Sequence, residues 1–231
     1  MLGSILFIIG QILATLIFAF LALLILPLPF RYRYTIMTGW ARFVVWWLEK
    51  TCHITYEIEG LENIPSGAAI LLSKHQSAFE TIVFQKIFPI QVFLLKRELF
   101  FIPLFGWALA SLEPIAINRN KRHQAIQELI KQGTARLSRG LWVVIYPEGT
   151  RVVPGKRERY RIGGALLAEK SGYPIVPVAI NSGKFWQRNS FIKQPGTIKI
   201  VIGPVIDPKG KDYKEINKLT EEWIEDQMLK M

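Results

Sequence analysis

The sequence predicts an α/β fold: a mixed, largely parallel central sheet flanked by helices, preceded by an N-terminal membrane-anchoring helix or two-helix motif. Three observations indicate this class. After Cys52, short apolar segments rich in β-branched or aromatic residues alternate with segments of helical periodicity, as in chains of strands and crossover helices. The first thirty residues carry no charged side chain. The 231 residues suffice for one compact domain with an appendage.

Seven segments have the composition of strands and are bounded by Gly, Pro or Asn. They are residues 54–58, 68–72, 92–95, 115–117, 142–146, 175–180 and 197–202. One-sided apolar spacing predicts two longer helices, one over residues 122–138 and one over residues 211–230. We therefore expect one catalytic domain over residues 54–231, with residues 1–53 forming a membrane anchor.

Residues 4–26 form an almost wholly apolar stretch in which Gln11 is the only strongly polar residue. About twenty apolar residues are enough for a helix to cross a bilayer. Pro27 and Pro29 end this helix, because proline cannot continue its hydrogen-bond ladder. A cleaved signal peptide is the alternative, but no basic segment precedes the apolar residues and no obvious small-x-small site follows them. We expect an anchor that either spans the membrane or forms a one-leaflet hairpin with a second helix over residues 35–52.

Positive charges begin directly after the apolar stretch, at Arg31 and Arg33. By the positive-inside tendency, the catalytic domain is expected on the cytoplasmic side of the membrane, which is the inner membrane if the chain is bacterial. Aromatic residues crowd the same stretch, as expected of side chains at the level of the lipid headgroups: Tyr32, Tyr34, Trp40, Trp46 and Trp47.

The net charge of +11 is concentrated between residues 114 and 170, where twelve Lys or Arg residues face four Glu. A surplus of this size points to an anionic partner near one face. Nucleic acid is not expected, because no zinc-finger spacing, RNP-like segment or basic zipper is present. Acidic lipid headgroups or a phosphorylated substrate are the better candidates. The lone Cys52 excludes an internal disulfide and a Cys-rich metal site, and we expect no metal.

His75 and Glu80 form a candidate base and carboxylate directly after a predicted strand. An imidazole can take up a proton near neutral pH, and a carboxylate on its other nitrogen would fix the tautomer and stabilise the imidazolium. Taken alone, the spacing is weak, since most histidines at strand ends are structural. Two further polar groups follow other predicted strands, namely Arg119 and the turn of Glu148, Gly149, Thr150 and Arg151. Because functional groups gather beyond the carboxyl ends of strands, we expect all three to meet at one edge of the sheet.

These polar groups also have ordinary structural interpretations. Arg119 could be a solvated residue at the start of a helix, and the turn could simply need the positive φ of Gly149. As functional groups, Arg119 and Arg151 are suited to hold a phosphate bidentately, and Glu148 could hold loop and site together. A hydrolase, dehydrogenase or P-loop enzyme is not indicated, because the sequence lacks a Gly-x-Ser-x-Gly elbow, a dinucleotide fingerprint and a Walker loop.

Several of these groups belong to ordered sequence blocks. The blocks are Lys74-His75-x4-Glu80, Lys96-x-Glu98-Leu99 with Pro103 and Gly106, Ile117-Asn118-Arg119, residues 146–151 and Val176-Pro177-Val178. From about residue 60 to residue 204 the chain thus resembles the 1-acyl-sn-glycerol-3-phosphate acyltransferase (PlsC-type, lysophosphatidate acyltransferase) family. The blocks are highly specific to this superfamily and much less specific for the acceptor.

The resemblance implies that His75 is the general base and Glu80 its carboxylate partner. The acceptor's phosphate site would be formed by Arg119, Glu148, Gly149, Thr150 and Arg151. Val176 and Pro177 would border the acyl-donor groove, and Lys96 and Arg161 are possible further contacts. The family usually has Asp where this chain has Glu80, and Lys where it has Arg161.

The implied reaction transfers an acyl chain from acyl-CoA or acyl carrier protein to the sn-2 hydroxyl of 1-acyl-glycerol-3-phosphate. The product is phosphatidic acid for phospholipid synthesis, and neither a cofactor nor a covalent enzyme intermediate is expected. The alternatives are the same chemistry on another lysolipid or on glycerol 3-phosphate, and a non-catalytic lipid-binding protein of the same fold. A membrane-tethered nucleic-acid binder rests on charge alone. The sequence leaves open the chain-length preference, the donor, the oxyanion donors and the oligomeric state.

Overall fold

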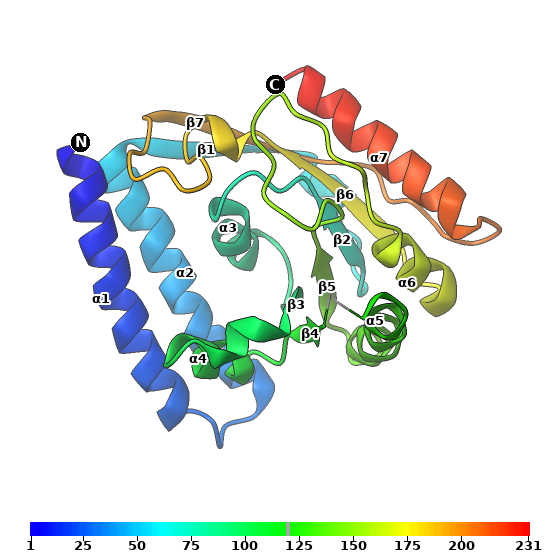
Figure 1. Ribbon diagram of the computed structural model, residues 1–231, viewed down its shortest axis with the longest axis horizontal. Coiled ribbons are helices and arrows are strands. Elements are labelled where there is room, and N and C mark those ends of the chain that lie inside the picture. Colours follow the sequence, from blue (N-terminus) through cyan, green and yellow to red (C-terminus); the bar gives the residue numbers. More distant parts are fainter. Residues whose placement is uncertain (119–120) are drawn as a thin grey trace.

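The computed structural model describes residues 1–118 and 121–231, and its strands form one sheet in the order β1-β7-β6-β2-β5-β3-β4 (Figure 1). The strands β2, β3, β4, β5 and β6 are parallel, β7 is antiparallel to β6, and β1 is parallel to β7. The predicted mixed, largely parallel sheet is therefore confirmed. The strands are β1 Ile54–Glu59, β2 Ile70–Ser73, β3 Gln91–Lys96, β4 Ile115–Ile117, β5 Trp142–Ile145, β6 Ile175–Ile180 and β7 Gly196–Ile202.

The helices of the described residues flank this sheet and include both longer helices expected after Cys52. They are α1 Leu2–Leu24, α2 Phe30–Cys52, α3 Phe79–Ile87, α4 Phe105–Ser111, α5 Arg122–Leu137, α6 Gly163–Ser171 and α7 Tyr213–Leu229, with 3-10 turns η1 Leu61–Asn63, η2 Arg97–Phe101 and η3 Ser182–Lys184. The second helix begins at Phe30 rather than at residue 35, because Pro29 precedes its first turn, where a proline costs no helical hydrogen bond.

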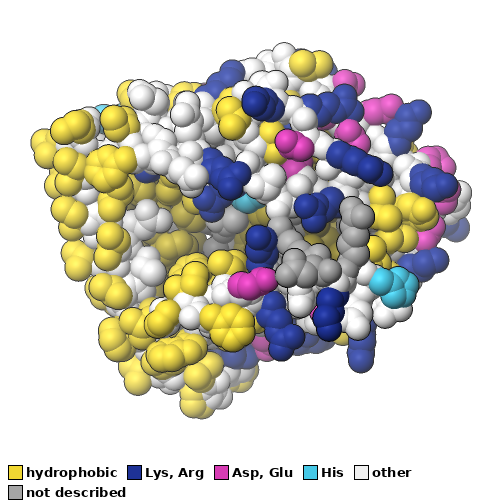
Figure 2. Space-filling view, in the orientation of Figure 1, with side chains coloured by type: hydrophobic (Ala, Val, Ile, Leu, Met, Phe, Trp, Pro, Cys, Tyr) yellow, Lys and Arg dark blue, Asp and Glu magenta, His cyan; other side chains and the backbone are white. Residues whose placement is uncertain are grey.

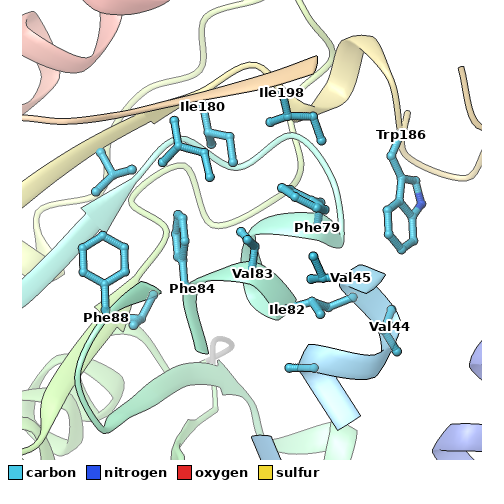
Figure 3. Close-up of a cluster of buried hydrophobic side chains, with 14 of the residues drawn as sticks. Val44, Val45, Phe79, Ile82, Val83, Phe84, Phe88, Ile180, Trp186 and Ile198 are labelled. Atoms are coloured by element: carbon cyan, nitrogen blue, oxygen red, sulfur yellow. The ribbon is translucent and has the colours of Figure 1, made fainter. Parts of the chain in front are cut away.

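The two faces of the sheet bury separate clusters because successive strand residues point to opposite sides. Leu71 and Val144 pack with α2 and α3 on one face, whereas Leu72 and Ile145 pack toward α5, α6 and α7 on the other. Figure 3 shows the first cluster, in which Phe79, Val83 and Phe84 of α3 lie between the sheet and α2. The strands β2, β5 and β6 are buried along their whole length, as in a sheet covered on both faces.

The helices α1 and α2 lie side by side as a hairpin at one end of the sheet (Figure 1). Gly10 allows this close contact, since a Cβ atom there would lie 2.1 Å from the Nε1 atom of Trp47. The first turns of α1 also contact the body. The Ser4 hydroxyl accepts a hydrogen bond from the Lys193 N–H, and the ring of Phe7 packs edge-on against Trp186.

The other end of α1 packs against α4, where Ala22 and Ile25 join a small apolar cluster with Ala108 and Leu112. Among the described residues, α1 is the helix long and apolar enough to cross a membrane, with a mean hydropathy of 2.6. Its packing against the body at both ends shows that it is not a helix projecting away from the rest of the chain.

Candidate active site

The base and the glycine turn predicted from the sequence lie together because β2 and β5 are parallel neighbours. Their following loops are joined through the backbone of His75. Its N–H donates to Oε2 of Glu148 at 2.9 Å, and its carbonyl accepts from the N–H of Val152 at 2.7 Å. The expected convergence is thus present for two of the three polar groups. The third, Arg119, lies outside the described residues.

The imidazole of His75 contacts the carboxylate of Glu80, with 3.3 Å between Nδ1 and Oε1. Glu80 is fully buried in the first turn of α3. Its Oε1 atom also accepts the backbone N–H groups of Gln76 and Ser77, at 2.6 and 2.8 Å. Its Oε2 atom accepts the hydroxyls of Ser77 and Ser182, at 2.6 and 2.8 Å. The glutamate therefore reaches both the backbone ahead of α3 and the base, with a somewhat long contact to the base.

The charge state of Glu80 determines which nitrogen of His75 is free. Burial acts to raise the pKa of Glu80, but the hydrogen bonds from His75 and Ser77 and the attraction of the imidazole hold it below its ordinary value of 4.5. An ionised carboxylate can only accept hydrogen bonds, so Nδ1 carries the proton and Nε2 keeps its lone pair. This arrangement leaves Nε2 able to remove a proton from a bound hydroxyl.

The ring of Tyr146 packs against one face of the His75 imidazole. The two rings stack at a centroid distance of 3.9 Å and an interplanar angle of 13°. Sequence reasoning did not identify this contact, nor the hydroxyls of Ser77 and Ser182. The spacing Ser77-x-x-Glu80 matches a helix N-terminal capping signature and could have revealed Ser77. Ser182 follows β6, so no local signal links it to Glu80.

The side chain of Glu148 lies between the base and a buried cation. Its Oε1 atom is 2.7 Å from Nζ of Lys74, while its Oε2 atom accepts the His75 N–H. Burial raises the pKa of Glu148 to about 7, against the attraction of Lys74. These contacts fit the predicted role of holding loop and site together.

An apolar cavity of about 530 Å³ opens at this site. His75, Lys96 and the turn residues Gly149, Thr150 and Arg151 are among its lining residues. Most of the other lining side chains are apolar and come from the hairpin, β3 and α4, including Phe18, Met37, Trp40, Val92, Leu95 and Leu109, with Gln85 and Gln91 among the polar ones. A mainly apolar pocket that also presents a few polar and cationic groups suits an amphiphilic ligand.

A second, more polar cavity of about 1140 Å³ lies on the other side of the turn. It is lined by Arg159, Arg161 and the start of α6, and it shares Lys96, Gly149 and Thr150 with the apolar cavity. Gly149 has a φ of +69°, and a Cβ atom there would come within 2.8 Å of Nε of Arg161. The positive φ favours glycine at this turn, and a Cβ atom there would also push the Arg161 side chain aside.

Arg188 is a further cation at this site that the sequence did not single out. Its Nη1 atom lies 3.2 Å from the Thr150 hydroxyl and 3.3 Å from the Arg151 carbonyl oxygen. The loop after η3 thus brings a second guanidinium to the turn that carries Arg151. Figure 2 shows Lys and Arg side chains gathered over the centre and right of this face, beside the hydrophobic surface of the hairpin.

Val176 and Pro177 lie in the interior of the sheet and line neither cavity. The strand β6 runs between β2 and β7, so Pro177 does not lie on an edge strand. It is accommodated because the pairing of β6 with β7 begins one residue later, at Val178. The Val176-Pro177 segment thus lies beside β2 within the sheet, opposite Leu71 and Leu72.

Known proteins have similar sequences and a similar fold. A family model described as Acyltransferase matches residues 55–181. Over 205 residues the chain is 43% identical to the 1-acyl-sn-glycerol-3-phosphate acyltransferase of Pseudomonas aeruginosa, covering 87% of this chain and 80% of the relative. It is 30% identical over 149 residues to a chloroplast 1-acyl-sn-glycerol-3-phosphate acyltransferase of Arabidopsis thaliana, covering 63% of this chain and only 42% of that longer relative.

The fold matches the crystal structure of the 1-acyl-sn-glycerophosphate acyltransferase PlsC from Thermotoga maritima. The TM-score is 0.81 at 23% identity, over 99% of this chain and 94% of that one. The match includes the hairpin as well as the sheet, because it covers almost the whole chain. The family model and the Pseudomonas relative show that the chain belongs to the 1-acyl-sn-glycerol-3-phosphate acyltransferase family.

Proposed function

We propose that this chain transfers an acyl chain from a thioester donor, acyl-CoA or acyl carrier protein, to the sn-2 hydroxyl of 1-acyl-glycerol-3-phosphate, making phosphatidic acid. One observation carries the proposal. A candidate base that contacts a buried carboxylate lines a mainly apolar cavity, and Arg151 lines the same cavity. A lysophosphatidate brings a hydroxyl, a phosphate and one acyl tail, which match the base, the cation and the apolar lining.

The reaction needs only a base and a positioned acceptor. Nε2 of His75 takes the proton of the acceptor hydroxyl, whose oxygen attacks the thioester carbonyl. The tetrahedral intermediate then collapses, the C–S bond breaks, and the imidazolium returns its proton to the leaving thiolate. Glu80 stabilises the imidazolium formed between these steps. General-base catalysis of this kind contributes roughly 10²–10⁴-fold, and we invoke neither a metal, a cofactor nor a covalent enzyme intermediate.

The phosphate of the acceptor is assigned to Arg151, with Lys96, Thr150 and Arg188 around it. A guanidinium can bind two phosphate oxygens at once, which orients the acceptor as well as holding it. Arg119 remains a predicted second ligand. Arg161 and the basic second cavity are suited to the phosphates of the acyl donor.

We propose that the hairpin holds the enzyme at the membrane that contains its lipid substrate and product. The outward face of α1 exposes large apolar side chains, and Phe101 and Trp107 continue this surface beside it. Because α1 also packs against the body at both ends, we infer that it lies in one leaflet rather than spanning the bilayer. Arg31 and Arg33 favour the cytoplasmic side. Flotation with lipid vesicles and protease protection in native membranes test the association and its sidedness.

The function is tested by acyl transfer in mixed micelles, with lysophosphatidate and each donor, comparing wild type with His75→Ala. The variant should lose at least about 10²-fold in turnover while folding and floating with vesicles as before. His123→Ala is the matched control, because His123 is exposed on α5. Wild-type-like turnover in His75→Ala would remove the base assignment.

The choice of acceptor distinguishes the remaining alternatives. Preference for glycerol 3-phosphate or for a lysolipid with a capped phosphate would keep the chemistry and change the substrate. Tight binding of lysolipid without any transfer would instead indicate a non-catalytic protein.

A further inference from the structure

Lys74 and His75 are consecutive residues whose side chains lie on opposite faces of the sheet. His75 points toward Glu80 of α3. Lys74 points toward α7, and only 1% of its side chain is exposed. The residue next to the base is therefore a fully buried cation, which the mechanism above does not use.

Two carboxylates enclose this cation. Nζ of Lys74 lies 2.7 Å from Oε1 of Glu148 and 2.8 Å from Oε1 of Glu225. A buried ammonium is tolerated only when its charge is compensated, and among the described residues these two side chains are the acidic groups that contact Lys74. Glu225 comes from α7, beyond the residues 55–181 that the family model matches.

The position of Glu225 is itself determined by the packing of α7. Ile216, Thr220 and Ile224 are buried along one face of the helix. The buried Tyr160 donates a hydrogen bond from its hydroxyl to Oε1 of Glu225 at 2.9 Å. The packing of α7 and the hydrogen bond from Tyr160 thus fix the position of the Glu225 carboxylate beside Lys74.

Glu148 connects this cluster to the base. One of its oxygens faces Lys74, and the other accepts the backbone N–H of His75 at 2.9 Å. A displacement of Lys74 would therefore move Glu148, and with it both the peptide that carries the imidazole and the turn that carries Arg151.

We propose that Glu225 is a positioning residue for His75, acting through Lys74 and Glu148 from the opposite face of the sheet. The expected effect on turnover rests on the proposed function, whereas the expected effect on the position of the His75 imidazole rests on the geometry alone. The C-terminal helix thereby sets the orientation of the base without contacting substrate.

The test replaces Glu225 with Gln and compares it with Glu221→Gln. Glu221 lies one turn earlier on the same helix and pairs with the exposed Arg157, not with Lys74. Both variants remove one negative charge from α7. Glu225→Gln should lower kcat by about 10-fold or more with little change in the acceptor KM, because misplacing a catalytic group costs turnover rather than affinity. Glu221→Gln should leave both near wild type.

A second readout does not depend on turnover. The chain has three histidines, so the imidazole ¹⁵N resonances of His75 can be assigned in micelles by their loss in His75→Ala. These resonances should shift in Glu225→Gln and stay unchanged in Glu221→Gln. Thermal unfolding of each variant shows whether it is folded at the assay temperature.

The two measurements give distinct outcomes. Unchanged His75 resonances and kcat in Glu225→Gln would overturn the proposal, and so would equal changes in both variants, since these would reflect only helix stability. If the wild type transferred no acyl chain at all, the proposed function would fail, and the His75 resonances alone would decide the positioning role.

Discussion

Replacing Glu80 with Gln tests the orientation of the base most directly, because it keeps the shape of the side chain and removes its charge. The carboxylate accepts three N–H groups at Oε1 and two hydroxyls at Oε2. A glutamine oxygen can keep the first three contacts. Its amide nitrogen has two hydrogens for the hydroxyls of Ser77 and Ser182, which can rotate to accept them. The number of hydrogen bonds is thus preserved while their charge assistance is lost.

The effect on stability should be modest and the effect on turnover large. A hydrogen bond to a charged group is worth about 1 kcal/mol more than a neutral one, and relieving a buried charge offsets part of the loss, so we expect about 2 kcal/mol of destabilisation. Without a carboxylate to stabilise the imidazolium, kcat should fall about 10³-fold, or roughly 4 kcal/mol of barrier. Glu80→Asp keeps the charge but is one methylene shorter, so it should lose only about 10-fold.

The pH dependence of stability gives an independent check on the charge of Glu80. Since its pKa in the folded state lies below its ordinary value of 4.5, its stabilisation is present above that pH and is lost as the pH falls further. The stability difference between wild type and Glu80→Gln should therefore shrink below about pH 4.5.

The assay measures kcat in mixed micelles at pH 7 together with thermal unfolding of each variant. Turnover in folded Glu80→Gln within about threefold of wild type would refute the orienting role. Equal activities of the Gln and Asp variants would refute it as well.

Two further predictions concern the turn after β5. Arg151→Ala should raise the acceptor KM by about 10-fold or more with a smaller effect on kcat, measured from initial rates, whereas Arg157→Ala should not; an unchanged KM would remove Arg151 from the phosphate site. Because burial raises the pKa of Glu148 to about 7, the folded protein binds this proton more tightly than the unfolded chain. Wild type should lose stability from this group as the pH rises from about 4.5 to 7, by at most about 1.4 kcal/mol per pH unit, and Glu148→Gln should not. A difference in melting temperature between wild type and Glu148→Gln that stays constant across this pH range would contradict the raised pKa of Glu148.

The strands were predictable because each is a short run of β-branched or aromatic residues with clear boundaries. Ile115–Ile117 and Ile175–Ile180 have the predicted bounds, and the longer helices α5 and α7 agree to within two residues. The short helices α3, α4 and α6 were not predicted individually, since seven to nine residues carry too little periodicity. The predicted start of α2, residue 35, was five residues too late, because the charged and aromatic residues of its first turns do not show a clear helical pattern.

The candidate site was partly predictable for a similar reason. His75, Glu80 and the 148–151 turn each follow a strand or begin a helix, so local sequence places them at one edge of the sheet. The partners of these residues come from distant segments. Ser182 meets Glu80 across 102 residues, and Glu225 meets Lys74 across 151.

The sequence by itself determined the fold class and the family, and it pointed to His75 and Glu80 as the candidate base and carboxylate, because these inferences depend on residue type and short spacing. Only the tertiary structure decided how the hairpin lies against the body and which groups surround the base. Nothing in the local sequence distinguishes Lys74 from a surface lysine, yet its side chain is buried between the carboxylates of Glu148 and Glu225. Its surroundings depend on which strands and helices pack together, and that choice is made by the whole core rather than by neighbouring residues.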